Sequence, residues 1–84
     1  TGTESYEWEN KFSDGVVEFE AFDFEGVVTV EIYDHFDHLV YSRTFIGKYE
    51  DRYEFDVTGI GDPGLWLTVI TTDHVDGFLT LTVD

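Results

Sequence analysis

The chain has no cysteine, no methionine, one proline and only four basic residues among its 84 positions. Without cysteine no disulfide can form, so a disulfide-stapled secreted scaffold is excluded. A cysteine nucleophile and a cysteine zinc site are excluded for the same reason. No apolar run reaches the roughly 18 residues of a membrane-spanning helix, so we expect no membrane insertion. Stability must come from apolar burial, a bound ion, salt or a partner surface.

Acidic residues outnumber basic ones by 19 to 4, and the formal net charge is −15 at pH 7. Because phosphate neutralisation needs Lys and Arg, nucleic-acid partners are excluded and anionic lipid surfaces are disfavoured. Aromatic residues nevertheless make up 18% of the chain and apolar residues 42%, which is unlike an acidic disordered tail. We predict a folded domain with an acidic surface, whose compatible partners are cations, neutral sugars or basic protein surfaces.

The whole chain, residues 1–84, is predicted to be a single domain. It contains no internal repeat, no linker and no signal peptide. Because it begins Thr-Gly-Thr, we interpret it as a mature or excised fragment of a longer precursor.

Apolar and polar residues alternate with a period of two along the chain, whereas helical periodicity is absent. This pattern predicts seven strands, over residues 3–12, 17–21, 27–33, 39–45, 53–57, 65–72 and 78–83. The turns between them are expected at 13–15, 25–26, 34–38, 46–52, 59–64 and 73–77. Short strands at this spacing favour an all-β fold, a seven-stranded antiparallel β-sandwich of immunoglobulin-like or jelly-roll-like type. A small β-barrel is the alternative.

The alternation also predicts which side chains are buried. Val28, Val30 and Ile32 are expected to face the core, and the strand 65–72 to be covered on both faces. The pattern breaks at Phe22 and Phe24, which indicates a bulge or a second apolar face. Five aromatics are expected outside the core: Phe22, Tyr33, Phe36, Tyr41 and Phe78. Five strand acids are expected to point outward: Glu18, Glu20, Glu31, Glu54 and Asp56.

Four turn acids form the candidate metal site. If successive strands alternate in direction, the first, third and fifth turns gather at one end of the sandwich, and they carry Asp14, Asp34, Asp37 and Asp62. Ca²⁺ takes six to eight oxygens from mixed carboxylate and carbonyl sets, so we predict a calcium-binding rim there. No Asp-x-Asp-x-Asp-Gly loop is present. Since Asp also favours turns, these residues are alternatively simple turn formers.

A zinc site is an alternative use of the same turns. His35 and His38, with Asp34 or Asp37, supply ligand types that zinc accepts. His74 is expected at the opposite end, so a site with three histidines is excluded within one molecule.

Catalysis finds little support in the sequence. Nucleophilic hydrolysis needs a serine positioned by a histidine, and no Gly-x-Ser-x-Gly motif surrounds any of the three serines. We therefore predict that the protein is not an enzyme.

Four segments follow a familiar outline: Val28-Thr29-Val30-Glu31-Ile32-Tyr33-Asp34, Leu39-Val40-Tyr41-Ser42, Pro63-Gly64-Leu65-Trp66-Leu67-Thr68-Val69 and Asp76-Gly77-Phe78-Leu79-Thr80-Leu81-Thr82-Val83. In these segments the chain resembles the small β-sandwich modules appended to secreted peptidases and surface proteins, of the pre-peptidase C-terminal and proprotein-convertase P-domain type. The resemblance covers about two thirds of the chain, from Val27 onward. It implies a non-catalytic accessory module, extracellular or on the cell surface. No calcium-binding or catalytic residue of these families maps onto this sequence.

The leading interpretation is therefore an interaction module that packs against a neighbouring domain or protein surface. Three others stay open. Acid-rich, Lys-poor composition is typical of a salt-adapted, halophilic structural domain with no specific ligand. Aromatics beside carboxylates favour a carbohydrate-binding module. A DNA mimic or an inhibitor of basic proteins would need its acids on one face, whereas here they extend from Glu4 to Asp84.

Overall fold

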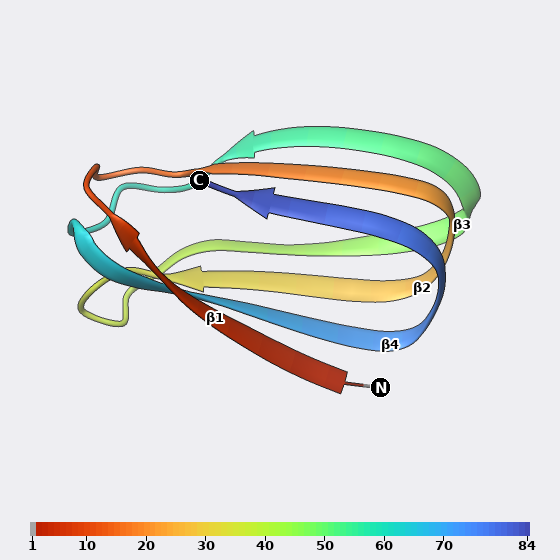
Figure 1. Cartoon of the computed structure of the whole chain (residues 1–84), viewed down its shortest axis with the longest axis horizontal. Helices are drawn as coiled ribbons and strands as arrows, with labels where there is room; N and C mark the ends of the chain where they lie inside the picture. Colours follow the sequence, from red (N-terminus) through yellow and green to blue (C-terminus); the bar gives the residue numbers. More distant parts are fainter. Residues whose placement is uncertain (1) are drawn as a thin grey trace.

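The structure is a computed structural model that describes residues 2–84, with the backbone alone for 48–50. The described residues form four β-strands and no helix (Figure 1): β1 (Gly2–Asn10), β2 (Val16–Tyr33), β3 (Leu39–Val57) and β4 (Gly64–Val83). The all-β prediction is thus confirmed, whereas the division into seven separate strands is not. In the part of the chain described, no helix is long and apolar enough to cross a membrane.

The strands form one antiparallel sheet with the order β1-β4-β2-β3. β2 lies inside the sheet and pairs with β3 and with β4 along nearly its whole length. β1 pairs with β4 only over residues 64–72. Because β1 and β3 stay at opposite edges, the sheet is open, and the alternative of a small closed barrel is wrong.

The three long strands turn back on themselves halfway along their length, at the right-hand end of Figure 1. These bends coincide with predicted turns, at 25–26, 46–52 and 73–77, but no strand ends there. Register shifts and left-handed backbone angles absorb the curvature, with φ of 51° at Asp23 and His74 and 109° at Gly26. A Cβ at Gly26 would lie 2.6 Å from the His74 carbonyl oxygen, so the bend requires glycine there.

The bends divide the sheet into two halves that face each other. The larger half contains four segments, 2–10, 27–33, 39–46 and 64–72, and the smaller half contains three, 16–22, 51–57 and 78–83. Phe19 of the smaller half stacks on Phe45 of the larger half, with 4.1 Å between ring centroids. These residues are not partners in the ladder, so the contact crosses the space between the halves. The seven predicted segments lie along the four strands, whereas seven separate strands and a sandwich are not confirmed.

The core fills the space between the halves. Its fully buried members are Val17, Phe19, Ala21, Phe24, Val28, Val30, Ile32, Phe45 and Trp66. Burial of Val28, Val30 and Ile32 confirms the predicted register. The predicted bulge is also present, since a register shift between Ala21 and Phe24 leaves Phe22 exposed and buries Phe24. The prediction that the strand 65–72 is covered on both faces holds only in part. Trp66 and Thr68 are buried, whereas Leu65 is 49% exposed and Leu67 and Val69 are half-buried.

Candidate functional sites

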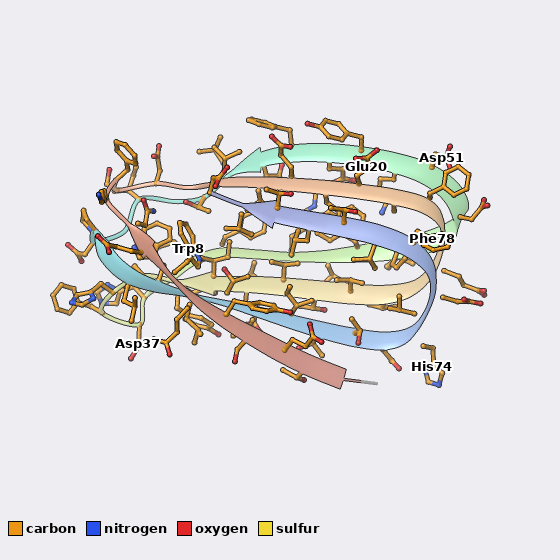
Figure 2. The ribbon with its side chains drawn as sticks, viewed as in Figure 1. Trp8, Glu20, Asp37, Asp51, His74 and Phe78 are labelled. Atoms are coloured by element: carbon orange, nitrogen blue, oxygen red, sulfur yellow. The ribbon has the colours of Figure 1, made fainter. Side chains whose placement is uncertain are left out.

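Three loops gather at the end of the molecule opposite the bends, and we call this end the turn end. It consists of residues 11–15, 34–38 and 58–63. Figure 2 places Asp37 at the turn end, while Asp51 and His74 lie at the bends. The prediction that alternate turns share one end is therefore confirmed. Backbone bonds join the loops, because Gly61 donates to the Ser13 carbonyl oxygen at 2.7 Å and Thr58 to that of Gly15 at 2.9 Å.

The Asp34 carboxylate lies at the centre of the turn end and is 2% exposed. Its Oδ1 accepts the N–H groups of Phe36 at 2.9 Å and His38 at 2.8 Å, and its Oδ2 accepts that of Asp62 at 2.9 Å. Burial raises the pKa of Asp34, but the three backbone N–H groups outweigh burial and hold this pKa below its ordinary value. Ionised Asp34 thus fixes the loop 34–38 and links it to the loop 58–63.

Two of the four predicted calcium ligands come together. Asp34, Asp62 and His38 offer ligand atoms that lie within 4.8 Å of one another. Asp14 and Asp37 contribute no atom to this group. Because both Asp34 oxygens already accept backbone N–H groups, the geometry favours the turn-former alternative for Asp34. The calcium rim of Asp14, Asp34, Asp37 and Asp62 stays a prediction.

The histidines do not form a common site. His35 Nδ1 accepts the Leu65 N–H at 3.2 Å, and His38 Nδ1 lies 3.4 Å from Asp34 Oδ2. His74 is at the bends, where it pairs with Asp73. The expected separation of His74 from the other two is confirmed.

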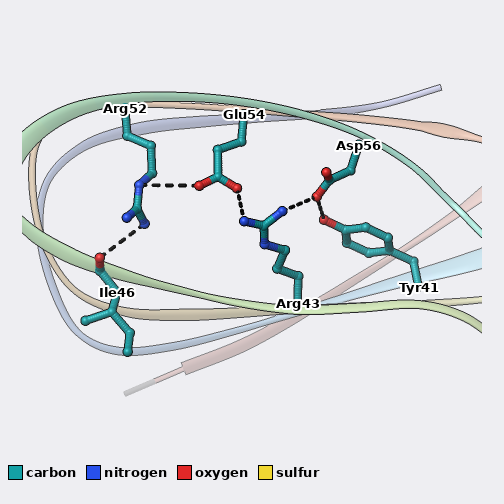
Figure 3. A network of polar contacts seen from close by, with 6 residues as sticks. All are labelled: Tyr41, Arg43, Ile46, Arg52, Glu54 and Asp56. Atoms are coloured by element: carbon teal, nitrogen blue, oxygen red, sulfur yellow. Dashed lines mark hydrogen bonds and ion pairs between the residues drawn. The ribbon is translucent and has the colours of Figure 1, made fainter.

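A polar network bridges the two halves of the sheet at the β3 edge (Figure 3). We call it the β3 network and define it by Tyr41, Arg43, Arg52, Glu54 and Asp56. Arg43, from the larger half, forms ion pairs with Glu54 and Asp56 of the smaller half. The Tyr41 hydroxyl also donates to Asp56 Oδ2, at 2.7 Å. Arg52 Nε lies 3.5 Å from Glu54 Oε1, and the Arg52 guanidinium donates to the Ile46 carbonyl oxygen at 3.2 Å. Both arginines of the chain therefore make polar contacts at this edge.

The charges of the β3 network are mutually stabilised. Its Tyr41 hydrogen bond, together with Arg43, holds the pKa of Asp56 below its ordinary value against the opposing effect of burial. Burial, and then the bond to Asp56, raise the pKa of Tyr41. The prediction that Glu54 and Asp56 point outward is therefore wrong. They point into the gap between the halves, because two of the four basic residues are there to pair with them.

Because Glu54 and Asp56 point inward, the apolar residues that alternate with them point outward from β3. Tyr53, Phe55 and Val57 are 61%, 55% and 56% exposed. Glu20 lies directly opposite Tyr53 and Glu18 opposite Phe55, so carboxylates flank the aromatic rings. We call this surface of the smaller half the outer face; it consists of Glu18, Glu20, Phe22, Tyr53, Phe55, Val57 and Phe78.

The aromatics predicted to be exposed divide into two groups. Phe22, Phe36 and Phe78 are exposed, as predicted. Tyr33 and Tyr41 are only half-buried, and their hydroxyls donate to Glu31 and Asp56. Phe22 and Phe78 are ladder partners on the outer face, whereas Phe36 lies at the turn end. Sequence reasoning missed Tyr53 and Phe55, for which the available signal was the pair of arginines able to draw Glu54 and Asp56 inward.

No known family model, curated protein or solved structure matches this chain.

Proposed function

We propose that this protein is a non-catalytic interaction module of a secreted or surface protein, which packs its outer face against a neighbouring domain or another protein. The observation that carries this proposal is the exposed row of Tyr53, Phe55 and Val57 on consecutive outward positions of one strand. Contiguous exposed apolar surface marks interaction sites more often than isolated exposed residues do. The small sandwich-like modules that the sequence resembles are accessory domains of this kind.

The flanking acids define the chemistry of the surface that fits. Glu18 and Glu20 lie beside the aromatic rings, and the chain carries a net charge of −15. A matching partner surface therefore combines apolar side chains with Lys or Arg at its rim.

The test compares two exposed phenylalanines. Phe55 belongs to the outer face and is 55% exposed, while Phe36 lies at the turn end and is 63% exposed. The immobilised chain and its Phe55→Ser and Phe36→Ser variants are incubated with the secreted proteins of the source organism. A retained protein is purified, and its Kd is measured for each variant. We expect at least about a tenfold loss of affinity for Phe55→Ser only. Equal affinity for both variants would place the contact elsewhere.

A carbohydrate-binding surface is the second candidate, favoured by the aromatic rings of Tyr53 and Phe55 beside carboxylate acceptors. The same three proteins are titrated calorimetrically with neutral oligosaccharides. Binding that depends on Phe55 but not on Phe36 would support a sugar ligand, and the absence of heat with any oligosaccharide would dismiss it.

A further inference from the structure

The second half of β4 has an unpaired edge. Residues 67–72 of β4 lie between β1 and β2, but residues 78–83 pair with β2 only. Val16 and Asp84 exchange two backbone bonds, at 2.7 and 2.9 Å. Because an antiparallel ladder alternates, Phe78, Thr80 and Thr82 also direct their N–H and C=O groups to β2. Those of Leu79, Leu81 and Val83 consequently point to the open side, which Figure 1 shows without a neighbouring strand in the same half.

A groove lies directly beside this edge. Its volume is about 480 Å³, and it is lined by Glu4, Tyr6, Trp8, Thr68, Ile70, Thr72, Leu79, Leu81 and Val83. β1 extends the larger half one strand beyond the smaller half. The floor of the groove is therefore the inward face of β1 and of residues 68–72 of β4, and no strand of the smaller half lies opposite β1. Two contacts hold Trp8 in the floor of the groove, since its indole donates to Thr68 Oγ1 at 3.0 Å and packs edge-on against Trp66.

The charge of the groove limits what can occupy it. Among the described residues Glu4 is the only charged one that lines the groove, and Tyr6 donates to the Glu4 carboxylate at 2.6 Å. A second copy of the chain would bring another net charge of −15 to this surface. Electrostatic complementarity therefore disfavours self-pairing and favours a cationic occupant.

We propose that this groove accepts an extended segment of a basic partner protein, which adds a strand to the free edge of β4. Main-chain bonds to Leu79, Leu81 and Val83 would supply affinity, and alternate apolar side chains of the segment would fill the groove over Trp8 and Ile70. A Lys or Arg among the groove-facing residues would meet Glu4, because Glu4 is the ladder partner of Ile70 and lines the groove with it. This site is separate from the outer face and does not depend on the function proposed for that face.

The first experiment uses as the probe a capped nine-residue peptide of alternating valine and lysine in which one terminal valine is replaced by lysine, so that one lysine faces Glu4 in the groove. Amide hydrogen exchange is measured by NMR with and without the peptide. We expect exchange to slow at Leu79, Leu81 and Val83, and to change less at Thr80 and Thr82, whose N–H groups already face β2. Unchanged exchange at the first three residues at saturating peptide, or no binding at all, would overturn the proposal.

Two altered peptides separate strand addition from general charge attraction. N-methylation at alternate residues removes the N–H groups that would pair with β4, and glutamate in place of lysine reverses the charge. Each change is expected to weaken binding at least about tenfold. Equal binding of the N-methylated peptide would show that no strand is added.

A matched pair of variants tests the location. Glu4→Lys changes a groove residue, whereas Glu9→Lys makes the same change on an exposed β1 residue outside the groove. We expect Glu4→Lys to weaken peptide binding at least about tenfold more than Glu9→Lys. Equal losses would overturn the assignment to the groove. Slow exchange at Leu81 without peptide, together with a dimer in sedimentation, would instead identify a second copy as the occupant and contradict the basic partner.

Discussion

The two sides of the folded sheet differ, because polar contacts bridge one of them and a groove remains at the other. On the β3 side, the two halves of one strand face each other and the β3 network bridges them (Figure 3). On the β4 side, the larger half carries β1 as an extra strand, and an apolar groove with a free edge remains. Two of the four basic residues lie in the β3 network, and no basic residue with a described side chain lines the groove. In a chain with so few basic residues, the placement of Arg43 and Arg52 favours internal closure on the β3 side, and the proposed strand addition would use the β4 side.

Removing Arg43 is expected to have the largest effect on this comparison. Arg43→Ala leaves Glu54 and Asp56 close together and about a quarter exposed, with only Arg52 nearby. We expect a loss of about 1–2 kcal/mol, which is a fall in Tm of roughly 5–15 °C by thermal unfolding. The partial exposure of these carboxylates keeps this figure below that for a fully buried pair.

Lys11→Ala is the matched control, because it removes the same charge from an exposed loop residue. Its Tm is expected to fall by no more than about 3 °C. Equal losses in the two variants would mean that net charge, and not the β3 network, limits stability.

The contrast between the two sides also explains what the sequence could predict. The positions of the apolar segments could be predicted, because the alternation of apolar and polar residues is a local property. Which alternate residues are buried could not be predicted everywhere, since Tyr53, Phe55 and Val57 are exposed. The continuity of the long strands could not be predicted, since Glu25-Gly26 has a composition that suits both a hairpin turn and a bend within one strand. Only the neighbouring strands distinguish the two, because β2, β3 and β4 bend at the same place and stay paired.

The sites depended even more on contacts between distant residues. The orientation of Glu54 and Asp56 follows from Tyr41 and Arg43, which lie 11 or more positions earlier in the chain. For the turn end, the alternation of strand direction was enough to predict that Asp34 lies near Asp62. It could not predict that backbone N–H groups would occupy the Asp34 oxygens, because that depends on the detailed path of the loop 34–38.

Acid should weaken the β3 side through Asp56. The pKa of folded Asp56 lies below the ordinary value of 3.8, so the ionised carboxylate contributes stability above about pH 4. This contribution is lost as the pH falls through the lower folded value. We expect the stability difference between the wild type and Asp56→Asn to shrink between about pH 5 and pH 2, as measured by urea unfolding. A constant difference over this range would contradict the inferred pKa shift.

Salt and calcium separate the acidic surface from the turn end. Molar NaCl is expected to raise the Tm by screening the repulsion among 19 acids, more than millimolar Ca²⁺ does in place of chelator. The reason is that Asp34 already accepts three backbone N–H groups. A rise at millimolar Ca²⁺ that Mg²⁺ does not reproduce, and that Asp62→Asn abolishes, would support the calcium rim instead.

The smallest effect is expected in the groove. Tyr6 is 53% exposed, and its described hydrogen bond is to the neighbouring Glu4. Tyr6→Ala should therefore change the Tm by no more than about 3 °C, while it removes part of the floor on which an added strand would lie. Affinity for the valine–lysine peptide should fall at least about threefold, whereas Arg43→Ala should leave it unchanged under conditions in which that variant is folded. If Tyr6→Ala were as destabilising as Arg43→Ala, the groove would be part of the internal packing, and the difference between the two sides would disappear.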